Sequence, residues 1–142
     1  MSSANDASDS NARIQAIRVP DAGRMRALPR HFGRRLLTVE GSIYGALGRL
    51  APEYKGAYWE MFELTNSGFY MAPQTEPLRL VVEGNGYDGL MSADAAGITA
   101  CLFCYSELSF LYPDDLFSKH FLWLRDFAAQ HAEAASIFAA ID

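Results

Sequence analysis

The chain has 142 residues, of which half are hydrophobic and 13% aromatic, so it can bury one core without disulfides or a structural metal. This composition excludes a disordered chain, and two cysteines are too few for a secreted disulfide framework. The longest apolar run is too short to cross a membrane, and the amino-terminal residues lack the pattern of a secretory signal. We therefore expect a cytoplasmic protein with one domain at residues 13–142, preceded by a disordered leader at residues 1–12.

The net charge of −5 is unevenly distributed along the chain. Residues 1–35 carry seven arginines and three aspartates, a charge of +4, so residues 36–142 carry −9. Such an arginine-rich arm indicates either a nucleic-acid contact or pairing with acidic groups of the body. Pairing is favoured, because the arm has no interleaved aromatic residues and the acidic body would repel phosphate.

The first predicted elements precede the aromatic part of the chain. Residues 13–29 alternate short apolar groups with arginine and are interrupted by two prolines and a glycine, which predicts an irregular arm. Apolar residues from Leu36 to Leu50 then recur largely at helical spacing, and this pattern ends before Pro52. A helix is therefore expected over residues 36–50.

Four short runs rich in aromatic and β-branched residues are typical of strands. Residues 65–68 (Thr-Asn-Ser-Gly) separate the first two runs, and Asn85-Gly86 separates the last two, where both turn residues accept a positive φ at little cost. The simplest arrangement is an antiparallel meander of about four strands packed against several helices, an α+β fold in a single domain. The predicted strands are residues 58–64, 69–72, 78–83 and 87–91.

Three further helices are expected after the strands. Ser92 can cap the first of them, and Asp94 in its first turn interacts favourably with the helix dipole. Residues 93–111 are apolar nearly all round, which predicts a helix buried against the sheet. A Pro-Asp-Asp sequence at 113–115 begins a second helix with one apolar stripe, and residues 132–141 form a short third helix or turn.

Two short motifs suggest chemistry that their context does not support. Gly84–Gly89 matches the letters of the dinucleotide-binding fingerprint, but the strand pattern continues through Leu90 and no second βαβ unit follows. Cys101 and Cys104 match a redox or zinc motif, but they lie inside an apolar helical pattern, where cysteine behaves as a small hydrophobe. Neither a bound nucleotide nor a metal is expected.

Candidate acid–base groups are equally isolated. Glu60 and Glu63 stand three residues apart on a predicted strand, so they point to opposite faces and cannot share a substrate. His131 follows the helix that begins near Asp115, and we expect its side chain to approach the C-terminus of that helix. We therefore expect no enzyme activity, no small-molecule substrate and no cofactor.

Several motifs are specific in combination. They are Tyr54–Trp59, Asn66–Pro73, Asn85–Tyr87, Ser92–Ile98 and Ile141–Asp142. Together with residues 31–35 (His-Phe-Gly-Arg-Arg), they resemble the antirestriction proteins of the KlcA/ArdB type. This resemblance implies a bacterial cytoplasmic protein, carried on plasmids and other mobile elements, that protects incoming plasmid or phage DNA from type I restriction enzymes. It also implies that no catalytic site is present.

The partner implied by the resemblance is the type I restriction–modification complex, affected by protein–protein contact or indirectly. DNA mimicry is not expected, because the 17 acidic residues are offset by 12 basic ones and form no long run. The alternative function is a small nucleic-acid-binding regulator that uses the arginine-rich arm, although the charge of the body argues against DNA binding, and no membrane partner is expected. The candidate partner-binding residues, taken from exposed turns and family motifs, are Tyr58, Trp59, Asn66, Ser67, Gly68, Asn85, Asp88, Asp94 and Asp142.

Overall fold

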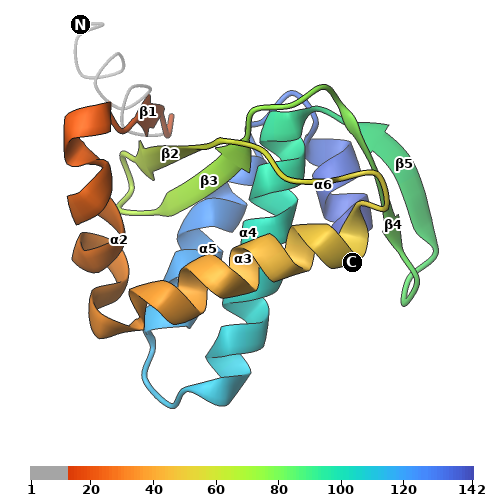
Figure 1. Cartoon of the computed structure of the whole chain (residues 1–142). Helices are drawn as coiled ribbons and strands as arrows, with labels where there is room; N and C mark the ends of the chain where they lie inside the picture. Colours follow the sequence, from red (N-terminus) through yellow and green to blue (C-terminus); the bar gives the residue numbers. More distant parts are fainter. Residues whose placement is uncertain (1–12) are drawn as a thin grey trace, which may run out of the picture.

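The computed structural model of the protein describes residues 13–142, which form one core around a central helix, α4 (Ala93–Leu111). Three helices and strands of both sheets pack on α4, and it is buried along most of its length (Figure 1). The α+β fold in a single domain is therefore confirmed. The remaining elements are β1 (Ala16–Arg18), α2 (Arg24–Phe32), α3 (Leu36–Leu50), β2 (Trp59–Leu64), β3 (Phe69–Pro73), β4 (Leu78–Val82), β5 (Tyr87–Met91), α5 (Leu116–Ala128) and α6 (Ala134–Ile141), with 3-10 turns η1 (Asp21–Gly23) and η2 (Gly33–Arg35).

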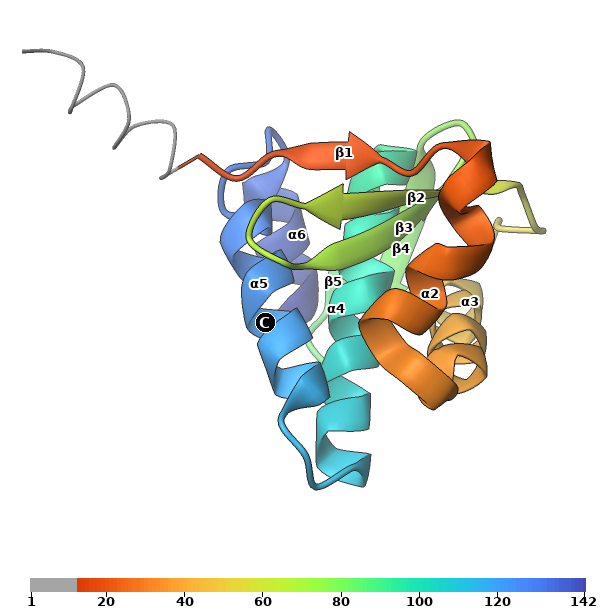
Figure 2. The same cartoon turned by 90° about the vertical axis from the view of Figure 1, so that its left-hand side faces the viewer.

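The strands form two antiparallel sheets, β1-β2-β3 and β4-β5. The two predicted hairpins are confirmed, with Met61 opposite Met71 in the first and Val82 opposite Tyr87 in the second. The prediction that the two hairpins join in one four-stranded meander is wrong. The chain leaves the first sheet at Pro73 and enters the second sheet after Pro77, and neither proline has a backbone N–H to donate to a strand ladder. The two sheets lie on opposite sides of the upper half of α4 (Figures 1 and 2).

The predicted irregular arm is also wrong, because it contains a strand and a helix. β1 pairs with β2, and α2 continues through Pro29. A three-residue strand is too short to leave a clear alternation in the sequence. Pro29 removes the hydrogen bond to the carbonyl of Met25, and Met25 is 91% exposed, so water can satisfy that carbonyl. The predicted leader, residues 1–12, lies outside the described residues.

The start of the described chain is joined to a distant part of the fold. The backbone N–H of Ile14 donates to Gln130 Oε1 over 2.9 Å, and Gln130 Nε2 donates to the carbonyl of Ile14 over 2.9 Å. Gln130 is the second residue after α5, so this amide clamp holds β1 against the carboxyl-terminal third of the chain (Figure 2). Together with the β1–β2 ladder, it fixes the beginning of the arm on the body.

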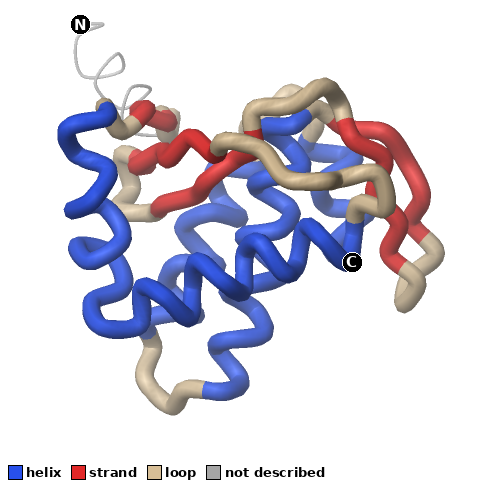
Figure 3. Tube along the Cα trace, viewed as in Figure 1, coloured by secondary structure: helices blue, strands red, loops and turns tan. Residues whose placement is uncertain are grey.

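The backbone of helix α4 lies in direct contact with the backbone of β3. A Cβ atom placed on Gly97 would lie 2.4 Å from the Met71 oxygen and 2.5 Å from Ala72 Cα. Two side chains of α4 contact the same strand, since Tyr105 Oη donates to the carbonyl of Phe69 over 2.6 Å and Cys101 Sγ lies 3.7 Å from that of Met71. The predicted packing of this helix against the sheet is confirmed. Figure 3 shows the strands gathered toward one end of the helices.

The two cysteines are core residues, as predicted. Both are free and buried, and burial raises the pKa of the Cys104 thiol to about 11 and that of Cys101 above its usual range. Among residues 13–142, no helix combines the length and the apolarity that a membrane span requires.

We expect both thiols to be unreactive in the folded protein, because a reagent needs access and the thiolate form. The measurement is a colorimetric thiol titration at about pH 8, first in buffer and then in urea. Native protein should show no reaction over the time in which urea-unfolded protein releases two equivalents. Rapid reaction of one thiol in buffer would contradict the placement of Cys101 and Cys104 in the core.

Candidate functional site

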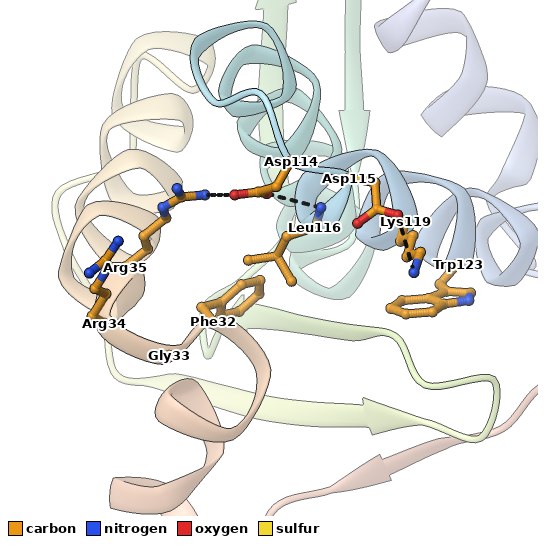
Figure 4. A pocket seen from close by; sticks show the side chains of 9 residues that line it. All are labelled: Phe32, Gly33, Arg34, Arg35, Asp114, Asp115, Leu116, Lys119 and Trp123. Carbon is orange, nitrogen blue, oxygen red and sulfur yellow. Dashed lines mark hydrogen bonds and ion pairs between the residues drawn. The ribbon is translucent and has the colours of Figure 1, made fainter.

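Two open hollows adjoin one another on the face formed by the end of α2, the η2 turn, the start of α5 and the β2–β3 turn. Their volumes are about 490 and 430 Å³, and they share Leu116 and Trp123 as lining residues. We call this combined surface the α2–α5 trough. The larger hollow is drawn in Figure 4, with residues 32–35 on one side and residues 114–123 on the other.

The floor of the trough is apolar. Phe32 is buried and its ring centroid lies 4.6 Å from that of His120 and 5.7 Å from that of Phe69. Leu116 and Trp123 are half-buried and continue this surface along α5 (Figure 4). The β2–β3 turn holds the far end, because Asn66 Nδ2 donates to the carbonyl of Trp123 over 2.9 Å.

The rim of the trough carries four basic and three acidic side chains. Arg35 Nη1 lies 2.7 Å from Asp114 Oδ2, and its guanidinium carbon lies 4.0 Å from the centroid of the Tyr112 ring. Arg34 extends beside Arg35 (Figure 4) and makes no ion pair within residues 13–142. The other two ion pairs of the rim are Arg30–Glu63 at 2.7 Å and Lys119–Asp115 at 3.3 Å.

Two histidines line the smaller hollow and add no charge to it at neutral pH. His31 Nε2 lies 2.9 Å from Glu63 Oε2, and burial lowers the pKa of His31 despite that contact. His120 is 2% exposed, and burial lowers its pKa to about 4. Its Nδ1 atom has no hydrogen-bond partner among the described residues.

Unusual backbone conformations occur at both ends of the trough. Gly33 has a φ of +57° and a ψ of −134°, so only glycine can turn the chain there from α2 toward Arg34 and α3. Ser67 has a φ of 88°, which a residue with a Cβ adopts only at a cost. Asn66 stabilises this turn, because its Oδ1 accepts from the N–H of Gly68 over 3.1 Å.

Replacing Ser67 should reveal this cost. We expect Ser67→Gly to leave the free energy of unfolding unchanged or to raise it by up to about 1 kcal/mol, because relief of the positive φ outweighs the greater freedom of glycine in the unfolded chain. We expect Ser67→Val to lower it by about 1–2 kcal/mol, since a β-branched residue fits this conformation least. Urea denaturation of both variants measures the difference. A glycine variant less stable than the valine variant would contradict the strain at residue 67.

Three of the nine predicted partner-binding residues, Asn66, Ser67 and Gly68, lie at the trough. A Cβ on Gly68 would lie 3.0 Å from Trp123 Cβ, so this glycine allows the turn to approach α5. The structure places the other six residues elsewhere. No common surface therefore contains all nine.

The predicted aromatic pair occupies two environments. Tyr58 is exposed, and the guanidinium carbon of Arg24 lies 4.7 Å from its ring centroid. Trp59 is 4% exposed and donates from Nε1 to Tyr54 Oη over 2.8 Å. Trp59 is therefore a core residue in this structure, whereas Tyr58 can still contact a partner.

Two of the predicted polar residues lie in the β4–β5 hairpin. Asn85 Nδ2 donates to the carbonyl of Ala140 over 2.8 Å, which satisfies the end of α6. Asp88 accepts two hydrogen bonds from Arg79, of 2.8 and 2.6 Å, and this ion pair lowers the pKa of Asp88. Both side chains are thus engaged within the fold.

The last two predicted residues are Asp94, in the first turn of α4, and Asp142, which follows α6. Asp94 accepts from Tyr70 Oη over 2.8 Å, and its other carboxylate oxygen lies 2.8 Å from His131 Nε2. The His131 ring lies beside the last turn of α5, with its centroid 6.4 Å from that of the Phe127 ring, but its Nε2 is engaged with the carboxylate of Asp94 in the first turn of α4 and not with a carbonyl of α5. This hydrogen bond raises the pKa of His131. Asp142 is exposed after α6.

Four of the seven arginines at residues 13–35 pair with carboxylates of the body, namely Arg18, Arg24, Arg30 and Arg35, which is the interpretation that the sequence favoured. Arg18 Nη1 lies 3.3 Å from Glu60 Oε1, and Arg30 binds Glu63. Glu60 and Glu63 thus serve different arginines and share no site, which confirms the sequence interpretation. Within the described range, no group of three or more His, Cys, Asp or Glu side chains is arranged to hold a metal ion.

The sequence interpretation missed most of the trough. Its basic rim comes from residues 30–35 and from Lys119, and its half-buried aromatic side chain from Trp123. One feature of the sequence pointed to this surface. In the motif at residues 31–35, Gly33 separates basic residues, and glycine is the residue that a sharp turn requires. The fold and the trough define a small α+β protein with a surface hollow lined by charged and aromatic residues.

Comparisons with known proteins identify the family. The family described as "Antirestriction protein" matches residues 52–142. Antirestriction protein KlcA from Escherichia coli is 44% identical over 137 residues, covering 91% of this chain and 94% of that protein. The putative antirestriction protein YubI from Escherichia coli strain K12 is 32% identical over 140 residues, covering 92% and 98%. The chain therefore belongs to the antirestriction protein family.

The likeness extends to the three-dimensional structure. A solved structure of the KlcA and ArdB proteins matches this fold with a TM-score of 0.86 at 42% identity, and the match covers 91% of this chain and 95% of that one. Those proteins are described as showing a novel fold and antirestriction activity against type I DNA restriction systems in vivo but not in vitro.

Proposed function

We propose that this protein acts in the bacterial cytoplasm as an antirestriction protein, protecting incoming plasmid or phage DNA from type I restriction–modification enzymes. The observation that carries the proposal is the match to the KlcA and ArdB structure, which covers 91% of the chain at 42% identity. A fold shared at this identity supports a shared activity more strongly than a fold alone, since one fold can host many functions.

We propose further that the protein acts without catalysis, through protein–protein contact or indirect interference. The activity of the KlcA and ArdB proteins in vivo but not in vitro supports a requirement for some component or state of the living cell. DNA mimicry is not favoured, because it needs free carboxylates spaced like phosphates. In this fold, Glu63, Asp88 and Asp114 are each bound to an arginine at 2.6–2.7 Å.

The alternative, a nucleic-acid-binding regulator that uses the arginine-rich arm, has less support. Arg18, Arg30 and Arg35 are engaged with carboxylates of the body, at 2.7–3.3 Å. Binding to phosphate would have to break these pairs on a chain whose net charge is −5.

The test of the proposed function is the plating efficiency of unmodified phage on cells that carry a type I restriction system, with and without this protein. We expect the protein to raise plating by several orders of magnitude. Phage already modified by the host should plate equally well in both strains, which controls for effects on adsorption and growth. Unchanged plating of unmodified phage, with folded protein present in the cells, would refute the proposal.

A further inference from the structure

The α2–α5 trough is a locally positive surface on an acidic protein. Its four basic and three acidic side chains give +1, which leaves −6 for the rest of the chain. Each of the three carboxylates already faces a basic side chain of the same rim, at 2.7–3.3 Å. The trough can therefore accept negative charge from outside more readily than it can accept positive charge.

Two of the basic side chains are free to change partner. Arg34 is exposed and makes no ion pair within the described part of the chain. Lys119 pairs with Asp115 one helical turn earlier, and both side chains are more than half exposed, so that pair contributes little and exchanges easily. Figure 4 shows Arg34 at one end of the larger hollow and Lys119 near the other.

The floor between these cations suits apolar side chains. Leu116 and Trp123 are half-buried and face the hollow (Figure 4), and tryptophan and arginine are enriched among the residues that dominate protein–protein binding energy. The β2–β3 turn positions Trp123 through Asn66 and keeps Ser67 at a positive φ on the edge of the surface. The trough thus combines an apolar floor with cations at separated points of its rim.

We propose that the α2–α5 trough binds an extended acidic segment of a partner protein, whose carboxylates contact Arg34 and Lys119 and whose apolar side chains cover Leu116 and Trp123. This inference rests on the proposed function, because it names the chemistry of the partner through which the protein acts. A nucleic acid fits less well, since it carries a phosphate at every nucleotide and the trough supplies only two exchangeable cations.

The first test compares two charge reversals of equal size. Arg34→Glu with Lys119→Glu changes the trough, whereas Arg49→Glu with Arg125→Glu changes exposed positions on α3 and α5 that do not line it. In the phage plating experiment, we expect the trough variant to lose protection by about tenfold or more and the control by less than about twofold. Thermal unfolding must show that both variants remain folded. Equal protection by the two variants would overturn the inference while leaving the antirestriction function intact.

The second test measures binding directly, with the purified full chain and tryptophan fluorescence as the signal. Trp59 is buried, so changes in emission report on Trp123. The probes are a synthetic peptide of alternating aspartate and leucine, a peptide of alternating lysine and leucine, and a single-stranded thymidine oligonucleotide of equal length. We expect saturable binding of the acidic peptide alone, weakened about tenfold by Arg34→Glu with Lys119→Glu.

The outcomes separate the two proposals. Tighter binding of the oligonucleotide would assign the trough to a nucleic acid, and no binding of the acidic peptide would overturn the inference. Failure of the wild-type protein to protect phage would refute the proposed function, yet the peptide titration would still decide what the trough binds.

Discussion

Replacement of Gly97 by alanine is expected to lower the free energy of unfolding by about 3 kcal/mol, at the upper end for an overpacked core. The added Cβ would lie 2.4 Å from the Met71 oxygen and 2.5 Å from Ala72 Cα, both backbone atoms that can move only if α4 separates from β3. Alanine favours a helix over glycine by about 1 kcal/mol, so the packing cost must exceed that gain. Urea denaturation followed by circular dichroism measures the effect.

Gly48→Ala is the matched control for this prediction. Gly48 lies in α3, and a Cβ there would have no atom within 4 Å apart from its chain neighbours and the nearby backbone of its own helix. We expect this variant to be more stable than the wild type by about 0.5–1 kcal/mol, from helix propensity alone. Equal midpoints for Gly97→Ala and Gly48→Ala would show that α4 and β3 do not meet at backbone distance.

Replacement of His120 by phenylalanine should remove much of the sensitivity of the fold to acid. Burial lowers the pKa of His120 from 6.5 to about 4, so the unfolded chain takes up a proton there before the folded protein does. Stability attributable to this group is therefore fully present above about pH 6.5 and declines as the pH falls toward about 4. When the pH falls from about 7.5 to about 4.5, the free energy of unfolding of the wild type should decrease by about 2–3 kcal/mol more than that of His120→Phe. Urea denaturation at each pH measures this difference.

His131 provides a control with the opposite sign. Its hydrogen bond with Asp94 raises its pKa in the folded protein, so the stability from this pair is complete below the unfolded value of 6.5 and is lost as the pH rises through the raised pKa. His131→Gln should therefore cost more stability at about pH 6 than at about pH 9. The same pH dependence in both histidine variants would contradict these two environments.

Local features of the sequence predicted the local structure well. The Asn85-Gly86 turn was predicted because both residues tolerate positive φ, and Gly86 has a φ of +76°. The cap of α4 was predicted from Ser92, whose Oγ accepts from the N–H of Ala95 over 3.1 Å. In these cases the residues that decide the conformation lie within four positions of one another.

The features that were missed depend on contacts between distant residues. Trp59 and Trp123 are equally aromatic in sequence, yet the former is buried in the core and the latter lines the trough. The trough itself joins residues 30–35, 63–67 and 114–123, which meet only after α5 has packed beside the first sheet. The spacing of residues along the chain carries no information about contacts between such distant segments, so a sequence pattern could not predict this surface.

The amide clamp between Ile14 and Gln130 has a consequence for biosynthesis. The two residues are 116 positions apart, so at typical translation rates the ribosome adds Gln130 about 6–23 s after Ile14. Until then β1 lacks this anchor, and the nascent chain presents its arginines and an incompletely attached strand to other molecules in the cell. We expect chaperone dependence to be concentrated in that interval and to end when the last third of the protein emerges.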